Sequence, residues 1–259
     1  MNILQEIAAR TKERIEAQKK ILPMAQIIEM TSLDTGSEFP FEKALRSDDI
    51  AFICEIKKAS PSKGIIAEEF PYVAIAEDYE AAGAAAISVL TEPFWFKGSD
   101  SYLREIADTV NIPLLRKDFT VDPYMIYEAK LLGASAVLLI CSILDQNTLA
   151  EYIELAHSLG LSALVEVHDE TEIAMALSAN ASIIGVNNRN LKTFEVDMSL
   201  SERLRKLVPP DVIFVSESGI NTPDDIEKLR KIGANAALIG ERIMRSADKR
   251  GEIGRLRGE

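Results

Sequence analysis

The chain has 259 residues, 47% of them hydrophobic, and a formal net charge of −12 with a pI near 4.8. A chain of this length can bury a large core in one domain, and its acidic balance argues against a nucleic-acid binder, which needs a basic face. No apolar run reaches the roughly 18 residues of a membrane span, and no signal peptide is visible, so we expect a cytoplasmic protein.

The beginning of the chain is expected to form a helical extension. Asn2 can cap a first helix with an apolar face, Pro23 interrupts this pattern, and a short helix over Phe41–Arg46 leads into the first strand. We expect residues 1–49 to pack as helices across an end of the main unit, residues 50–259, and not to form a separate domain.

A repeat organises the main unit. The segments AAGAAAISVL (81–90), LLGASAVLLI (131–140) and KIGANAALIG (231–240) nearly superimpose, each running from a helix end through a Gly-Ala turn into an apolar strand. In a fourth copy, SANASIIGVN (178–187), Asn180 replaces the helix-ending glycine. Asn is the usual second choice at a left-handed helix cap.

Four further apolar runs alternate with these copies. They are predicted strands at 53–57, 112–119, 161–167 and 212–217. Helix starts are indicated by Asp169 and Ser199, which open capping-box patterns, and by Pro123 and Pro223 at expected first-turn positions. Eight strand–helix units in about 200 residues predict a (β/α)8 TIM barrel. An open doubly wound sheet is the alternative, but a period of two units around the chain favours closure.

Polar side chains gather at one end of the predicted strands. In such barrels the catalytic face is where the strands' carboxyl ends emerge. In chain order, these side chains are Glu55, Lys57, Glu92, Lys117, Cys141, Glu166, Asn187, Arg189, Glu217, Ser218 and Gly240. The opposite strand ends offer Asn111 or Asp211 at most. Two lysines and several carboxylates around one cavity predict acid–base chemistry; the alternative is a salt-bridge network that plugs the barrel.

Small residues after the last two predicted strands indicate an anion site. Ser218 and Gly219 follow the seventh strand, and Gly240 and Glu241 follow the eighth. Their backbone N–H groups can bind an anion, and these two loops form the usual phosphate site of the fold. Ser60 of the first loop can join them. We therefore expect a small phosphorylated substrate.

Aromatic and apolar residues are expected at the mouth of the barrel. Pro61 and Phe119 suit contact with a flat ring, although they could instead pack against the extension. The Phe94–Phe96 cluster, which follows the second strand, is either part of the core or a mobile cover over the site.

The histidines and cysteines receive less weight. His157 and His168 are interpreted as surface or helix-start residues, with acid–base work by His168 as the alternative. Cys54 and Cys141 fall in apolar runs and are expected to be buried free thiols. Because no close CxxC or HxxxH spacing exists, we expect no metal site.

Seven motifs resemble, in order and spacing, the indole-3-glycerol-phosphate synthase family of tryptophan biosynthesis. They are CEIKKASPSKG (54–64), SVLTEPFWFKGS (88–99), LLRKDF (114–119), LVEVH (164–168), IGVNNRNL (184–191), VSESGI (215–220) and LIGERIM (238–244). The resemblance covers essentially the whole chain and includes the helical extension. It implies a TIM barrel enzyme that needs no cofactor or metal.

The resemblance also implies a reaction and residue roles. The family converts 1-(2-carboxyphenylamino)-1-deoxyribulose 5-phosphate to indole-3-glycerol phosphate, with loss of carbon dioxide and water. By matched position, Lys117 is the general acid toward the ribulose carbonyl and Glu166 the general base in dehydration. Lys57 holds the substrate carboxylate, while Glu55 and Glu217 tune the lysines. Which lysine serves which step stays open.

Further positions carry binding roles by the same resemblance. Asn187, with Arg189 close by, is expected to orient the reacting region. The phosphate is expected to lie against Ser60, Ser218, Gly219, Gly240 and the backbone of Glu241. We expect a monomer or weak homo-oligomer that binds neither nucleic acid nor membrane.

Two other functions are compatible with a phosphate-binding barrel. One is another phosphate-binding barrel, such as a sugar-phosphate isomerase or the alpha subunit of tryptophan synthase. The other is a non-catalytic barrel that binds a phosphorylated effector. The pair Lys57 and Lys117 disfavours the first, and the intact lysine–glutamate set disfavours the second.

Overall fold

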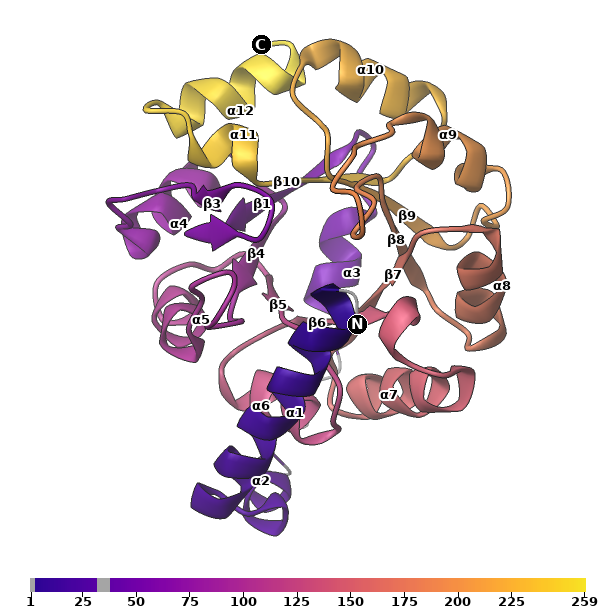
Figure 1. The fold of residues 1–259 in the computed structure, drawn as a ribbon. Coiled ribbons are helices and arrows are strands. Elements are labelled where there is room, and N and C mark those ends of the chain that lie inside the picture. The colour runs from indigo at the N-terminus through magenta and orange to yellow at the C-terminus, as the bar shows by residue number, and fades with distance from the viewer. Residues whose placement is uncertain (1–2, 32–37) are drawn as a thin grey trace.

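Eight parallel strands close into a barrel in the computed structural model, which describes residues 3–31 and 38–259 (Figure 1). The strands are β1 (Ala51–Ile56), β4 (Ala86–Leu90), β5 (Leu114–Lys117), β6 (Ala136–Ile140), β7 (Ser162–Val167), β8 (Ile183–Asn187), β9 (Ile213–Glu217) and β10 (Ala236–Ile239). Closure is complete because β1 pairs with both β4 and β10. The predicted (β/α)8 barrel is confirmed, and the open sheet is excluded.

Helices surround the barrel on its outside (Figure 1). They are α4 (Tyr72–Ala81), α5 (Asp100–Ala107), α6 (Tyr124–Leu131), α7 (Gln146–Ser158), α8 (Glu170–Ser178), α9 (Ser199–Arg205), α10 (Pro223–Lys231), α11 (Glu241–Met244) and α12 (Lys249–Arg257). A 3-10 turn, η1 (Cys141–Ile143), follows β6. The sequence pattern did not predict the antiparallel hairpin β2 (Ala59–Ser60) and β3 (Gly64–Ile65) in the loop after β1.

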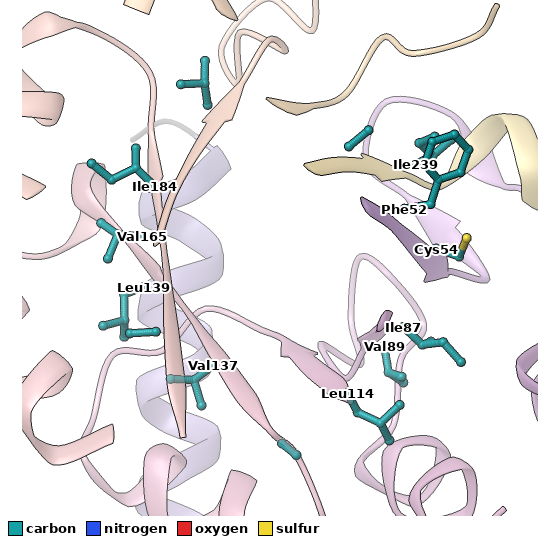
Figure 2. Close-up of a cluster of buried hydrophobic side chains, with 14 of the residues drawn as sticks. Phe52, Cys54, Ile87, Val89, Leu114, Val137, Leu139, Val165, Ile184 and Ile239 are labelled. Atoms are coloured by element: carbon teal, nitrogen blue, oxygen red, sulfur yellow. The ribbon is translucent and has the colours of Figure 1, made fainter. Parts of the chain in front are cut away.

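The strands are buried on both faces, which accounts for their continuous apolar sequences. In β1, Phe52 and Cys54 belong to the cluster between strands and helices, whereas Ala51 and Ile53 belong to the cluster inside the barrel. This alternation follows from the two-residue period of a strand. Figure 2 shows part of the outer cluster. A side chain's position in the strand therefore decides whether it faces the barrel interior.

The N-terminal extension contributes to both ends of the barrel. It comprises α1 (Ile3–Ile21), α2 (Met24–Thr31) and α3 (Pro40–Leu45), and the predicted cap Asn2 lies outside the described residues. The beginning of α1 lies at the strands' carboxyl ends, and α3 packs into the interior cluster from the other end. The sequence had indicated helices across one end only.

Helix caps show where local prediction succeeded and failed. Asn180 has a φ of 59°, which confirms the left-handed cap. Only half of the capping box predicted at Asp169 forms, because Asp169 accepts the N–H of Glu172 but the Glu172 carboxylate accepts the N–H of His168. The capping box expected at Ser199 is wrong. The carboxylate of Asp197 accepts both the N–H and the hydroxyl of Ser199, so Ser199 becomes the first helical residue.

The prolines fit their predicted positions to within one residue. Pro223 is the first residue of α10, as predicted, while Pro123 immediately precedes α6. None of the helices over residues 3–31 and 38–259 has the length and apolar character that crossing a bilayer requires.

Candidate active site

A cavity of about 720 Å³ opens at the carboxyl ends of the strands. Every residue singled out from the sequence as catalytic or substrate-binding lines it. These residues are Glu55, Lys57, Ser60, Pro61, Lys117, Phe119, Glu166, Asn187, Arg189, Glu217, Ser218, Gly219, Gly240 and Glu241. Ile3, Leu4 and Ile7 of α1 add an apolar wall on one side.

Lys117 lies between two carboxylates from distant strands. At the end of β5, its Nζ donates to Glu217 Oε2 of β9 at 2.5 Å and lies 3.4 Å from Glu166 Oε2 of β7. The Lys117 side chain is 12% exposed, and both glutamates are buried more deeply. One ammonium group therefore balances two buried carboxylates, so a substrate that enters can exchange for either contact.

This arrangement separates the proton affinities of the three groups. Burial would lower the pKa of Lys117, but the charges of Glu217, Glu166 and Glu55 outweigh it and raise that pKa. Burial would raise the pKa of Glu166, but the neighbouring Lys117, His168 and Asn187 lower it to about 2. For Glu217, burial and the neighbouring Glu166 charge raise the pKa despite Lys117. Glu166 is therefore the firmly ionised carboxylate of the pair.

Lys57 forms a second ion pair on the other side of the cavity. Its Nζ donates to Glu55 Oε1, two residues earlier on β1. A Cβ on Gly240 would lie 2.3 Å from that same Glu55 oxygen. Gly240 thus makes room for the Glu55 carboxylate, besides presenting its backbone to the cavity.

Glycine serves a similar purpose on β8. A Cβ on Gly185 would lie 2.2 Å from Glu217 Oε1, a buried oxygen with no hydrogen-bond partner among the described residues. Sequence reasoning missed Gly185. The signal was a glycine inside an otherwise apolar strand, which often marks close approach of another group.

The loop after β9 is held in an unusual backbone conformation. Ser218 and Gly219 have φ values of 67° and 85°, and a positive φ at a non-glycine residue is uncommon. The side-chain amide of Asn188, which is buried, donates to the backbone oxygens of Glu217 and Ser218 at 3.0 and 3.1 Å. Asn188 therefore positions this loop, although the sequence analysis did not single it out.

Further cations surround the predicted phosphate end. Lys63, Arg242 and Arg245 line the cavity there. Lys63 Nζ lies 3.7 Å and Arg245 Nε 3.2 Å from Glu241 Oε1. The sequence analysis missed these three because they lie in loops and helices beyond the strand ends.

The aromatic loop after β4 borders both the interior cluster and the cavity. Trp95 and Phe96 pack against the interior cluster, and Phe96 also lines the cavity with its ring 6.1 Å from that of Phe119. The mobile cover stays a prediction. The Glu92 carboxylate accepts the backbone N–H groups of Phe94, Trp95 and Phe96 at 2.7–3.0 Å. The placement of Glu92 among the cavity groups was therefore wrong, because its carboxylate turns into the loop that it holds.

Two other strand-end expectations need correction. Cys141 is a buried free thiol, as expected, but it does not line the cavity, and its Sγ faces the backbone oxygen of Glu172 at 3.8 Å. The opposite end of the barrel is also less bare than predicted, since Asp49 there pairs with Arg230 at 2.8 Å. That pair is solvent-exposed, so the buried charges still distinguish the cavity end.

The two sequence neighbours of Lys117, Arg116 and Asp118, belong to a buried network of ion pairs. Asp118 accepts from Arg14 of α1 and from the Thr91 hydroxyl, both at 2.7 Å. Arg116, on the other side of Lys117, is fully buried and donates to Glu128 at 2.6 Å. Lys117 thus extends into the cavity between two charged neighbours that are already paired: Arg116 binds the outer helix α6, and Asp118, at the edge of the cavity, binds Arg14 of α1.

Within residues 3–31 and 38–259, no group of three or more His, Cys, Asp or Glu side chains is arranged to hold a metal ion.

Comparison with known proteins gives a consistent result. A model of the family "Indole-3-glycerol phosphate synthase" matches residues 4–256. The chain is 61% identical over 257 residues to the indole-3-glycerol phosphate synthase of Ruminiclostridium cellulolyticum, covering 99% of each chain. It is 54% identical over 247 residues to that of Endomicrobium trichonymphae, covering 95% of this chain and 96% of the other.

Among solved structures, a thiamine phosphate pyrophosphorylase from Pyrococcus furiosus aligns with a TM-score of 0.61 at 16% identity. The alignment covers 84% of this chain and 96% of the other, and at this identity it shows the shared fold alone.

Proposed function

The chain belongs to the indole-3-glycerol phosphate synthase family, and on that premise we propose how its cavity residues divide the work of catalysis. It is a carboxy-lyase of tryptophan biosynthesis that acts on a small phosphorylated substrate. The substrate, 1-(2-carboxyphenylamino)-1-deoxyribulose 5-phosphate, must lose carbon dioxide, close a five-membered ring and lose water. Each step needs a group at a defined place.

The phosphate is proposed to bind at the end of the cavity formed by the loops after β9 and β10. Ser218, Gly219 and Gly240 present backbone there, and Ser60 approaches from the hairpin after β1. Backbone N–H groups with fixed direction suit a phosphate, and Arg245 adds charge complementarity. This end anchors the substrate, so that its ring extends toward the lysines.

The anthranilate end is proposed to contact Lys57 and the apolar wall. Lys57 would hold the carboxylate until it leaves as neutral carbon dioxide, a task that suits a single flexible ammonium better than a bidentate guanidinium. Phe119, Pro61 and the first turn of α1 offer flat or apolar surface for the aromatic ring. Glu55 keeps the Lys57 ammonium in place when no substrate is bound.

Lys117 is the proposed general acid for ring closure. Attack by the aromatic carbon builds negative charge on the ribulose carbonyl oxygen, and a nearby ammonium proton neutralises it. The raised pKa of Lys117 keeps it protonated until that charge develops. Glu217, at 2.5 Å, orients the ammonium, and Asn187 with Arg189 orients the hydroxyl groups of the substrate.

Glu166 is the proposed general base for dehydration. Removal of the hydroxyl group as water requires a base on one side and an acid on the other. The lowered pKa of Glu166 keeps its carboxylate ionised, and its Oε2 faces Lys117 across 3.4 Å. Lys117, the proposed acid of ring closure, and Glu166, the proposed base of dehydration, are therefore close enough to act in turn on the same part of the substrate.

The observation that carries these roles is the position of Lys117 between Glu217 and Glu166 at the cavity floor. The test is indole fluorescence produced from the carboxyphenylamino substrate, without added cofactor. Lys117→Met and Glu166→Gln should each lower kcat by about 10²–10⁴-fold, while inorganic phosphate still binds by calorimetry. Lys57→Met should mainly raise KM, because it removes a binding contact.

A matched control is Lys228→Met, which removes an exposed ammonium on α10 and should leave kcat unchanged. If the folded Lys117→Met variant kept kcat within a few-fold of the wild type, Lys117 would not be the acid. Loss of phosphate binding in that variant would indicate a collapsed cavity instead.

Three further properties are part of the proposal. Residues 1–49 and 50–259 form one unit, supported by Leu4 and Phe41, which share the interior cluster with the strands. All the residues with a proposed role belong to one copy of this chain, which is compatible with activity as a monomer or weak homo-oligomer. A cytoplasmic location is proposed because a charged phosphate ester does not cross a bilayer unaided, and the enzyme must act where its substrate is made.

A further inference from the structure

His168 lies between two carboxylates directly beside the proposed base. It follows β7, two residues after Glu166. Its Nε2 lies 3.3 Å from Glu166 Oε1, and its Nδ1 lies 3.0 Å from Glu172 Oε2 of α8. The backbone N–H of His168 donates to the same Glu172 oxygen at 2.8 Å. Glu172 therefore fixes both the backbone and the ring of His168.

The two contacts favour a positively charged ring. A neutral imidazole has one N–H donor and one acceptor lone pair, whereas an imidazolium has two donors. Nδ1 of His168 forms a hydrogen bond with Glu172, whereas Nε2 has no hydrogen-bond partner among the described residues and faces Glu166 Oε1 as an ion-pair contact at 3.3 Å. Two carboxylates beside one ring favour the imidazolium form. Burial would lower the pKa of His168, but the carboxylates of Glu166 and Glu172 raise it to about 10.

The contact with His168 also divides the two oxygens of Glu166 between different partners. Oε1 faces His168, which does not line the cavity, while Oε2 faces Lys117, which does. A carboxylate held at one oxygen keeps its plane and rotamer, so the other oxygen presents its lone pairs in a constant direction. Such support of a functional group by a fixed neighbour is what precise geometry requires.

We propose that His168 is a positioning residue that, as a permanent imidazolium, holds Glu166 Oε1 and leaves Oε2 as the basic oxygen toward the substrate. This inference rests on the proposed role of Glu166 as general base. In the dehydration, Glu166 Oε2 accepts the substrate proton, and the hydroxyl leaves as water with a proton from a cavity lysine, Lys57 or reprotonated Lys117. His168 keeps both of its own protons throughout.

The remaining groups around this pair do not replace His168. Lys117 of β5 contacts only the other oxygen of Glu166. The groups that face Glu166 and His168 from the surrounding elements are Lys117, Asn187, Glu217, Cys141, Asp169 and Glu172. Lys117 is the cation among these groups, and its ammonium also pairs with Glu217. His168, which also pairs with Glu172, is therefore the cation that faces Glu166 Oε1.

The first test observes the ring directly and needs no activity. The chain has two histidines, so the imidazole nitrogen signals in a ¹⁵N NMR spectrum are readily assigned with a His157→Gln variant. At pH 8 both ring nitrogens of His168 should carry a proton. His157 should be neutral, because burial lowers its pKa. A neutral His168 ring at pH 8 would overturn the proposal, whatever Glu166 does in catalysis.

The second test follows the effect on Glu166. In His168→Gln, the acidic pKa of the pH profile of kcat/KM should rise by at least one pH unit, and kcat should fall about tenfold with KM little changed. The acidic pKa should rise because the anionic form of Glu166 loses the cation beside its Oε1. His157→Gln should reproduce the wild-type profile. An unchanged profile and kcat in folded His168→Gln would overturn the positioning role.

Two further variants separate the possible failures. If His168→Gln does not fold, Glu172→Gln, which weakens the hold on the ring, should shift the same pKa upward by a smaller amount, and no shift would overturn the proposal. If Glu166→Gln retains full activity, the role of Glu166 as base fails, while the NMR result still tests the charge of His168 separately.

Discussion

Replacing Gly185 by Ala tests whether the position of Glu217 controls the general acid. The added Cβ would lie 2.2 Å from Glu217 Oε1, about 1.2 Å short of the 3.4 Å at which ordinary contact begins. The oxygen belongs to the end of a flexible side chain, so the carboxylate can withdraw without backbone movement. Its hydrogen bond to Lys117, now 2.5 Å, must then lengthen or the ammonium must follow.

The expected magnitude follows from this displacement. A misplacement of about 1 Å in a catalytic arrangement can cost about 10²-fold in rate, so kcat should fall by that order with KM little changed. Stability should change less. Alanine makes the unfolded chain less flexible, which raises the free energy of unfolding by about 0.4–1 kcal/mol. Crowding against Leu164 Cδ1, 3.1 Å from the new Cβ, lowers the free energy of unfolding by about 1–3 kcal/mol.

The assay is production of indole fluorescence from the carboxyphenylamino substrate, with circular dichroism to follow unfolding. Gly254→Ala is the matched control. This glycine lies in α12, and its added Cβ would contact only the Glu259 side chain, at 3.3 Å. Wild-type kcat in the folded Gly185→Ala variant would refute the reasoning. The double variant with Glu217→Gln should be no slower than Glu217→Gln alone, since both act on one contact.

Two other changes test the support around the cavity. Arg14→Leu leaves Asp118 buried without its closest cation and should cost about 3–5 kcal/mol of unfolding free energy, at the low end because the Thr91 hydroxyl still donates. Burial raises the pKa of Asp118, but Arg14 and Arg116 outweigh it and lower that pKa. Its ionised form thus stabilises the fold above the ordinary carboxyl pKa near 3.9, and this contribution is lost as pH falls through the lowered value. Denaturant titrations should therefore show the two proteins converging toward pH 3, and a constant difference from pH 7 to pH 3 would contradict the assignment. Glu92→Gln weakens three charge-assisted hydrogen bonds to the aromatic loop. Steady-state kinetics should show a several-fold higher KM with a smaller change in kcat. An unchanged KM would mean that the loop does not contribute to substrate binding.

Much of the site was predictable because of how a parallel barrel is built. Each strand ends on the same side, so polar residues such as Lys117 and Glu166 that close apolar runs must converge there. The repeated helix–turn–strand pattern made the strand ends easy to locate. Local capping was less predictable, as Ser199 shows. The carboxylate of Asp197, two residues earlier, accepts the hydroxyl and the N–H of Ser199, so the Ser199 hydroxyl does not cap the helix.

The amino-acid sequence by itself determined the barrel, the end at which the chemistry gathers and the residue types available to it, because these depend on short-range periodicity and on strand direction. Only the tertiary structure decided the partners. The Lys117–Glu217 bond joins residues 100 positions apart, and the Arg14–Asp118 bond joins residues 104 apart. Such pairs arise from the register of a closed sheet and from the path of α1 over its mouth, neither of which any local segment encodes. For the same reason, the clearance at Gly185 and the ring contacts of His168 became visible only once the strands were assembled.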